Sequence, residues 1–146
     1  MATEYLRDGR APVPKKESTS RVMRANKAKN TKPEIKLRKA LWHAGHKGYR
    51  LHSKDIPGRP DIIYGKHELA IFVNGCYWHR CDKCEPSFPR SNQHFWREKF
   101  RKNKERDKRK IDELEAQGWR TITIWECEIK KELSTCIRKI SELMND

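Results

Sequence analysis

Apolar side chains recur at intervals of three or four residues between Gln93 and Gln117, while the other positions of this segment are mostly charged. This spacing predicts a long amphipathic helix, with one face packed against a core. Two polar residues, Asn103 and Asp107, share that face. Its members are Trp96, Phe100, Asn103, Asp107, Ile111 and Leu114.

Two further segments have the features of helices. In TKPEIKLRKALWHAGHKG (31–48), Thr31 is suited to cap the helix, Glu34 lies three residues later, and Gly45 and Gly48 favour termination. The segment IKKELSTCIRKISELM (129–144) is apolar along one helical face. It predicts one continuous C-terminal helix.

Short runs rich in apolar and β-branched residues alternate with turn sequences in the middle of the chain. They are YRLH (49–52), DIIY (61–64), ELAIFV (68–73) and WRTITIW (119–125). Helix, strands, helix, strand and helix in this order predict an α/β fold with a mixed central sheet. Residues 23–146 are expected to form a single domain. Residues 1–22 are polar and without periodicity, as in a flexible basic arm.

Charge indicates the kind of partner. The 146 residues include 34 Lys and Arg against 20 Asp and Glu, which gives a net charge of +14. Such an excess favours a polyanion, and nucleic acid is the leading candidate. An anionic membrane surface is the competitor, but no run approaches the roughly 18 apolar residues of a membrane helix. We therefore expect a soluble, cytoplasmic protein.

The segment NGCYWHRCDKC (74–84) concentrates cysteines and aromatic residues. Cys76, Cys81 and Cys84 have the spacing Cys-x4-Cys-x2-Cys, and Cys127 ends the last predicted strand, WRTITIWEC. Four thiolates suit a structural zinc site. The alternatives are buried or free thiols, or a redox pair. Cys136 is expected in the core, and an odd number of cysteines, five, argues against a disulfide framework.

Three side chains are candidates for catalysis. Asp107 lies on a core-facing stripe, where an acid must be paired or used. An ion pair with an arginine is its ordinary explanation; support of His79 as a general base is the functional one. His79 itself lies in the cysteine segment and could instead bind zinc. Asp61 follows PGRP, as in metal-dependent nucleases with a PD-(D/E)xK motif, although ELAIFVNG lacks the second acid and a turn-capping role remains open.

Taken together, these segments resemble the very short patch repair (Vsr) family of DNA mismatch endonucleases. The resemblance runs from about Ser20 to Cys127. Its blocks are SRVMRANKAKNTKPE, PGRPDI, IFVNGCYWHRC, FWREKFRKNKERDKR and GWRTITIWEC. It implies a restriction-endonuclease-like fold, a variant of PD-(D/E)xK, with helices flanking a mixed sheet and a structural zinc site.

The resemblance also implies roles for the candidate catalytic residues. Asp61 would bind Mg²⁺ together with the main-chain carbonyl of Val73, which replaces the missing second acid. His79 would activate the attacking water and Asp107 would support it. Glu34 matches an acidic residue that borders the active site.

Zinc and DNA contacts follow in the same way. The family's structural Zn²⁺ would be held by Cys76, Cys81, Cys84 and Cys127. Aromatic residues would wedge between base pairs beside the mismatch, with a methionine of the arm entering from the opposite groove; these are Tyr77, Trp78, Trp96 and Met23. For Trp96 core packing is the alternative, and Asn74 departs from the acidic or histidine residue of many relatives.

The function implied is Mg²⁺-dependent nicking of one strand 5′ to the thymine of a T:G mismatch, the product of 5-methylcytosine deamination. The expected partner is double-stranded DNA, bound by a monomer in the bacterial nucleoid, with a functional link to a DNA cytosine methyltransferase. A nuclease of the same fold that ignores mismatches is one alternative. The other is a zinc-stabilised DNA-binding module without catalysis.

Overall fold

The computed structural model describes residues 6–7, 11–12 and 30–145, which fall into two compact units. The first unit, Met1–Thr31, contains strands β1 (Leu6–Arg7) and β2 (Ala11–Pro12), which pair antiparallel. Met23, predicted to contact DNA, lies outside the described residues. The second unit, Lys32–Asp146, carries every other candidate residue.

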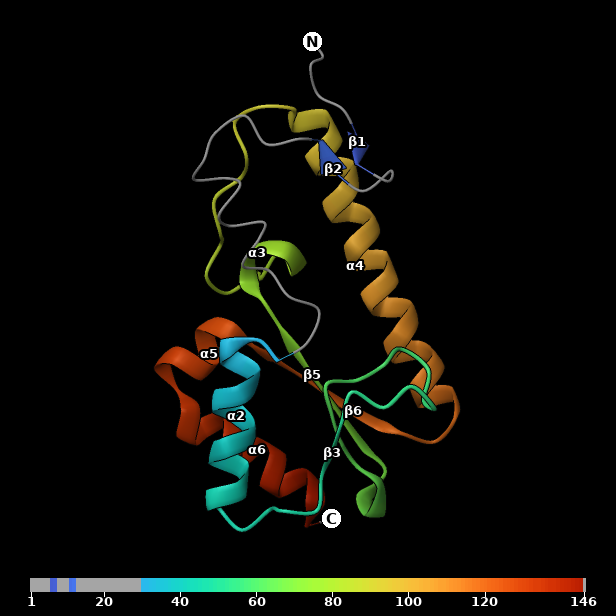
Figure 1. Cartoon of the computed structure of the whole chain (residues 1–146), viewed down its shortest axis with the longest axis vertical. Helices are drawn as coiled ribbons and strands as arrows, with labels where there is room; N and C mark the ends of the chain where they lie inside the picture. Colours follow the sequence, from blue (N-terminus) through green and yellow to red (C-terminus); the bar gives the residue numbers. More distant parts are fainter. Residues whose placement is uncertain (1–5, 8–10, 13–29, 146) are drawn as a thin grey trace. The chain divides into compact units, whose positions relative to one another are not determined.

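A four-stranded sheet forms the centre of the second unit (Figure 1). Its strands are β3 (Arg50–Leu51), β4 (Ile62–Tyr64), β5 (Leu69–Asn74) and β6 (Arg120–Trp125), in that spatial order. The pairs β3–β4 and β4–β5 are antiparallel, whereas β5–β6 is parallel. The predicted mixed sheet is therefore confirmed, and a 3₁₀ turn, η1 (Gly65–His67), joins β4 to β5.

Helices cover both faces of this sheet. One face packs on α2 (Lys32–His43), α5 (Glu126–Lys131) and α6 (Leu133–Met144), and the other on the long helix α4 (Gln93–Ala116) (Figure 1). Neighbouring side chains of a strand point to opposite faces: Ile62 joins the core under α2, whereas Ile63 joins that under α4. Burial on both sides explains why β4 and β5 are almost continuously apolar.

The predicted helices 31–48 and 93–117 are present, with helix α2 ending close to the expected glycine. Gly45 has a φ of +95°, and its N–H donates to the Trp42 carbonyl while that of His46 donates to Leu41. This pair of bonds is a Schellman motif, which satisfies the last carbonyls of a helix and favours glycine.

The prediction of one continuous C-terminal helix is wrong. The segment forms two helices, α5 and α6, which meet at Glu132, where φ is −139° and ψ is 47°. Apolar residues on both sides of the break enter the same core, so their periodicity continues across it. A second expectation also changes: Cys127 lies in α5, one residue beyond its start, rather than at the end of a strand.

Candidate active site and metal centre

Asp61 lies directly before β4 and directly after the turn PGRP. Its main-chain N–H donates to the Ile71 carbonyl (3.1 Å), and its carboxylate Oδ2 accepts a hydrogen bond from the Val73 N–H (2.7 Å). The preceding Pro60 is fully buried. The carboxylate is thus held against the end of β5 by bonds on both its main chain and its side chain.

Glu34 and His52 extend this site from two other elements. Glu34, in the first turn of α2, is 1% exposed, and its Oε2 is 2.7 Å from His52 Nε2 and 2.8 Å from an Arg38 guanidinium nitrogen. One ligand atom from each of Glu34, His52 and Asp61 lies within 4.8 Å of the other two. These side chains therefore form a compact cluster of two carboxylates and an imidazole.

Sequence reasoning did not identify His52. It lies just after β3, a strand of only two residues, with a φ of +48°, and its N–H donates to the Asp61 carbonyl (3.1 Å). A non-glycine residue in the left-handed region is uncommon and occurs more often at functional sites. Its position after YRL and before the turn was the only hint in the sequence.

The surroundings of Asp61 favour a bound cation. Burial raises its pKa to about 6, the Val73 N–H opposes that rise, and the nearby Glu34 carboxylate adds to it. Two acids in a partly dry cluster repel each other, and a divalent cation would offset the repulsion. The oxygen donors of Asp61 and Glu34 are of the type that Mg²⁺ prefers, so these residues fit the group.

His79 and Asp107 form a second pair beside this cluster. His79 closes the short helix α3 (Cys76–His79), and its Nδ1 is 2.5 Å from Oδ2 of Asp107 on α4. The buried side chain of Asn103, one turn earlier on α4, donates to the Trp78 carbonyl (3.3 Å) and so fastens α3 to α4. Asp107, on the core-facing side of α4, is therefore hydrogen-bonded to a histidine and, among the described residues, does not form the alternative ion pair with an arginine.

Asp61 and His79 both lie near the carboxyl end of β5. Burial is the largest influence on the pKa of Asp61, and His79 is the smallest of those that act on it. This placement has a simple structural origin, since α3 follows β5 after one glycine, and β5 is the strand whose Val73 N–H binds Asp61. The structure therefore brings together Glu34, Asp61, Val73, His79 and Asp107, with His52 in addition.

The four predicted cysteines also come together. Sulfur atoms of Cys76, Cys81, Cys84 and Cys127 all lie within 4.8 Å of one another, and Cys81 Sγ is 3.7 Å from Cys127 Sγ. A tetrahedral zinc site with Zn–S bonds of about 2.3 Å requires sulfurs about 3.8 Å apart. The N–H groups of Cys127 and Lys83 point at Cys76 Sγ and Cys81 Sγ, each at 3.4 Å. The donor set fits Zn²⁺.

The cysteines of the cluster differ in acidity: the pKa of Cys81 is lowered, because the effect of burial is outweighed by hydrogen bonds, including those from the main-chain N–H groups of Cys84 and Lys83. Burial raises the pKa of Cys76 and of Cys127, which as isolated thiols would remain protonated at neutral pH. A bound metal ion offsets that cost because it stabilises the thiolates. Cys136, by contrast, is buried in the core beside Ile140, as predicted.

Aromatic side chains gather between α3 and α4. Tyr77 and Trp78 are half-buried and lie edge to face at 5.1 Å between ring centroids. Trp96 is only 5% exposed and contacts Trp78 and Phe100 at 5.7 and 5.6 Å. Its surroundings in this structure are those of a core residue.

Exposed basic residues outnumber exposed acidic ones on α4. Its solvent-exposed residues include Arg97, Arg101, Lys102, Lys104, Arg106, Lys108 and Arg109. Among the described residues, no helix is long and apolar enough to cross a membrane.

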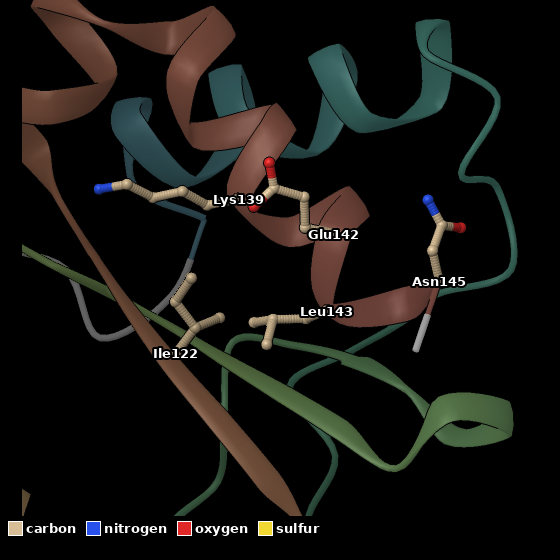
Figure 2. A pocket seen from close by; sticks show the side chains of 5 residues that line it. All are labelled: Ile122, Lys139, Glu142, Leu143 and Asn145. Atoms are coloured by element: carbon tan, nitrogen blue, oxygen red, sulfur yellow. The ribbon is translucent and has the colours of Figure 1, made fainter.

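An open pocket lies elsewhere, between β6 and α6 (Figure 2). It is lined by Ile122, Lys139, Glu142, Leu143 and Asn145. None of these is a predicted site residue, and the pocket lacks the paired acids and histidines that distinguish the Asp61 site. The candidate chemistry therefore belongs to the cluster around Asp61 and His79.

Comparison with known proteins identifies the family. The family model described as DNA mismatch endonuclease Vsr matches residues 11–85, just over half of the chain. The chain belongs to the Vsr family of DNA mismatch endonucleases. Vsr enzymes are endonucleases, so the acids and histidines of this site belong to a hydrolase that acts on DNA.

Relatives of this Vsr protein agree along most of the chain. It is 40% identical over 108 residues to the type II nicking enzyme V.XorIIP of Xanthomonas oryzae, covering 74% of this chain and 79% of the relative. It is 40% identical to the type II nicking enzyme V.NmeAIP of Neisseria meningitidis, covering 82% and 84%. DNA mismatch endonuclease Vsr of Escherichia coli is 36% identical, with 82% and 76% covered.

Proposed function

We propose that this Vsr-family protein is a Mg²⁺-dependent endonuclease that nicks one DNA strand 5′ to the thymine of a T:G mismatch. The observation that carries the proposal is the convergence of Asp61 with the His79–Asp107 pair at one end of β5. Metal-dependent hydrolysis of a phosphodiester uses an acidic residue that binds the metal and a general base that activates water, and Asp61 and His79 are suited to these two roles. The fold that we infer is the restriction-endonuclease-like variant of the family.

Metal binding is assigned to Asp61 and to the main-chain carbonyl of Val73. In an extended strand, the N–H and C=O of one residue point to the same edge of the strand. The Val73 N–H binds Asp61, so its carbonyl faces the same side. Glu34 and His52 border the position, and Mg²⁺ there would supply charge neutralisation at the phosphate and at the leaving oxygen.

His79 is assigned the role of general base. Since Asp107 accepts the hydrogen bond at Nδ1, the neutral imidazole carries its lone pair on Nε2. Nε2 takes a proton from a water molecule, whose oxygen forms the new bond to phosphorus as the bond to the leaving oxygen breaks in line. Asp107 stabilises the imidazolium that results.

Mismatch recognition is assigned to the aromatic cluster. Tyr77 and Trp78 are half-buried in α3, two residues and one residue before His79, and would enter an opened base step. Trp96 and Met23 complete the proposed wedge; Trp96 would have to leave its packed position on Phe100. Exposed Lys and Arg residues of α4 would contact phosphates.

The four cysteines are assigned to a structural Zn²⁺ that fastens α3, the loop after it and α5 together. Its position is next to the catalytic histidine, because Cys76 begins the helix that His79 ends. A T:G mismatch arises by deamination of 5-methylcytosine, so the proposal also implies a DNA cytosine methyltransferase in the same cell. The protein is expected to act as a monomer.

A nicking assay tests the proposal. Purified protein with Mg²⁺ is incubated with otherwise identical T:G and T:A duplexes, each labelled on the thymine strand. Cleavage of the T:G duplex alone, lost in Asp61→Ala and His79→Ala, is the expected result. Equal cleavage of both duplexes would favour a mismatch-independent nuclease, and binding without cleavage under any divalent metal would favour a DNA-binding module.

A further inference from the structure

Arg80 connects α3 with the loop that follows the cysteines. Its guanidinium donates to the carbonyls of Tyr77 (3.2 Å), Pro86 (2.9 Å) and Ser87 (3.1 Å). Its backbone has a φ of +53° and closes α3, directly after His79. Because one side chain donates to the carbonyls of three different residues, these bonds fix the path of the loop.

The same guanidinium lies over three aromatic rings. Its central carbon is 4.5 Å from the centroid of Phe100, 5.4 Å from that of Tyr77 and 5.5 Å from that of Phe88. Cations within about 6 Å of a ring centroid attract the ring face. Arg80 therefore holds Phe88 of the loop against Phe100 of α4, whose centroids are 5.7 Å apart.

Phe88 is held firmly and still reaches solvent. It is 36% exposed, and the exposed Arg97 of α4 approaches its ring to 5.8 Å. An exposed phenylalanine with two guanidinium groups near its ring, in the loop that precedes α4, combines the aromatic and cationic contacts used to bind nucleotides. Neither Phe88 nor Arg97 has a part in the hydrogen bonds or ion pairs of the catalytic site described above.

We propose that Phe88 is a further DNA-contacting residue: it packs against a nucleotide exposed by distortion of the bound duplex while Arg97 contacts an adjacent phosphate. Arg80 is its positioning residue. The inference rests on the DNA-endonuclease activity of the family and adds a contact outside the proposed wedge. It does not require the T:G preference or cleavage.

The test is DNA binding measured by fluorescence anisotropy, with Ca²⁺ in place of Mg²⁺ so that no strand is cut. Phe88→Leu is expected to raise Kd about 5- to 20-fold on T:G and T:A duplexes, from the loss of one aromatic contact with a nucleotide. Arg97→Gln is expected to reduce the slope of log Kd against log salt by about one. The Kd values test the role of Phe88 independently of nicking, so they remain decisive even if neither duplex is cut with Mg²⁺.

Trp42 provides a matched control. It is 47% exposed and has Lys47 at 5.2 Å from its ring, but it belongs to α2, which packs on the opposite face of the sheet from α4 (Figure 1). Trp42→Leu is expected to change Kd less than twofold. A Kd for Phe88→Leu that equals the wild-type value, or an equal loss in Trp42→Leu, would overturn the proposal.

Arg80→Lys separates positioning from charge. Lysine keeps the positive charge but cannot make the same set of planar bonds. We expect Arg80→Lys to weaken binding without changing the salt slope, and the double variant Arg80→Lys/Phe88→Leu to bind no worse than Phe88→Leu. Zinc content and the thermal midpoint are measured for each variant; a lower midpoint with an unchanged Kd, or additive losses in the double variant, would assign Arg80 a structural role only.

Discussion

The Nδ1 atom of His79 lies 2.5 Å from Oδ2 of Asp107, although 28 residues separate them in the chain. Both side chains are about three-quarters buried, with 27% and 21% of their surface exposed. This contact selects one tautomer of the imidazole, because the carboxylate accepts the proton on Nδ1. It converts a histidine beside a cysteine cluster into a candidate general base.

Asp107→Asn is therefore expected to slow nicking severely. The asparagine amide fits the same space but can present its NH₂ group to Nδ1, which favours the wrong tautomer. We expect the single-turnover rate on a T:G duplex with Mg²⁺ to fall about 10²- to 10⁴-fold, with DNA affinity little changed.

Asp112→Asn is the matched control for that change. Asp112 lies on the same helix, is exposed, and pairs with Lys108 at 3.0 Å. Its substitution should leave the rate within about twofold, because exposed pairs contribute little. A full rate in Asp107→Asn would remove Asp107 from the mechanism.

His52 is expected to matter through Glu34. The His52 imidazole is 2.7 Å from the Glu34 carboxylate, which is almost fully buried. Removing the imidazole therefore takes away one hydrogen-bond partner that fixes the orientation of Glu34. Glu34 and His52 border the proposed metal position, and groups around metal ligands typically change metal affinity about 10- to 100-fold. We expect His52→Ala to raise the Mg²⁺ concentration for half-maximal nicking by that factor, measured by Mg²⁺ titration of the single-turnover rate.

Two variants give this prediction its controls. His52→Gln retains a hydrogen-bond donor toward Glu34 and should recover part of the Mg²⁺ affinity. His43→Ala changes an exposed histidine at the end of α2 and should behave as wild type. If His52→Ala follows the wild-type titration curve, His52 has no role at the metal position.

Periodicity located Asp107, the acid of the proposed catalytic pair, but not the other residues around the site. Asp107 shares a helical face with Phe100 and Leu114, and this pattern alone shows that its carboxylate needs a partner. His52 has no such pattern, because β3 is two residues long and the contact with Asp61 depends on its pairing with β4. Long-range sheet pairing, rather than local sequence, creates the cluster with Glu34.

In the C-terminal helices, by contrast, a periodic pattern was present but did not show where the helix breaks. Ile129 and Cys136 fit one apolar stripe, yet the chain breaks between them at Glu132. Periodicity reports which side chains are buried, and both helices bury theirs in the same core. The dihedral angles at Glu132 are set by how α5 and α6 pack, which a spacing pattern does not encode.

Zinc should be bound stoichiometrically and stabilise the fold. We expect about one zinc per chain in protein purified without chelator. Cys127→Ser should lose that zinc and lower the free energy of unfolding by about 3–5 kcal/mol, since loss of a structural metal is among the largest single effects. Metal analysis and urea unfolding measure the two quantities.

Cys136→Ala separates the metal from general core damage. Cys136 is buried but belongs to the core under α6 rather than to the four-cysteine cluster. Its substitution should retain zinc and cost about 1 kcal/mol through the small cavity it leaves. Full zinc content in Cys127→Ser would contradict the four-cysteine assignment.

Gly58 ties the turn before Asp61 to helix α4. Its φ is +79°, and a Cβ at this position would lie 2.9 Å from Lys110 Cβ and 3.5 Å from Lys110 Cα. These atoms belong to the base of a helical side chain and to the helix backbone, so they cannot move aside freely. Gly58→Ala is therefore expected to reduce stability by about 1–3 kcal/mol, from the unfavourable φ and the contact together.

The same substitution should lower activity. Asp61 lies three residues after the glycine, and the turn positions its carboxylate to accept the hydrogen bond from Val73 of β5. Urea unfolding and single-turnover nicking, followed on the same samples, measure both effects. Gly48→Ala is the control, since a Cβ there meets no atom within 4 Å and its φ is not positive. Equal stability of the Gly58→Ala and Gly48→Ala variants would show that the turn accommodates a side chain by moving, and activity would then report whether Asp61 moves with it.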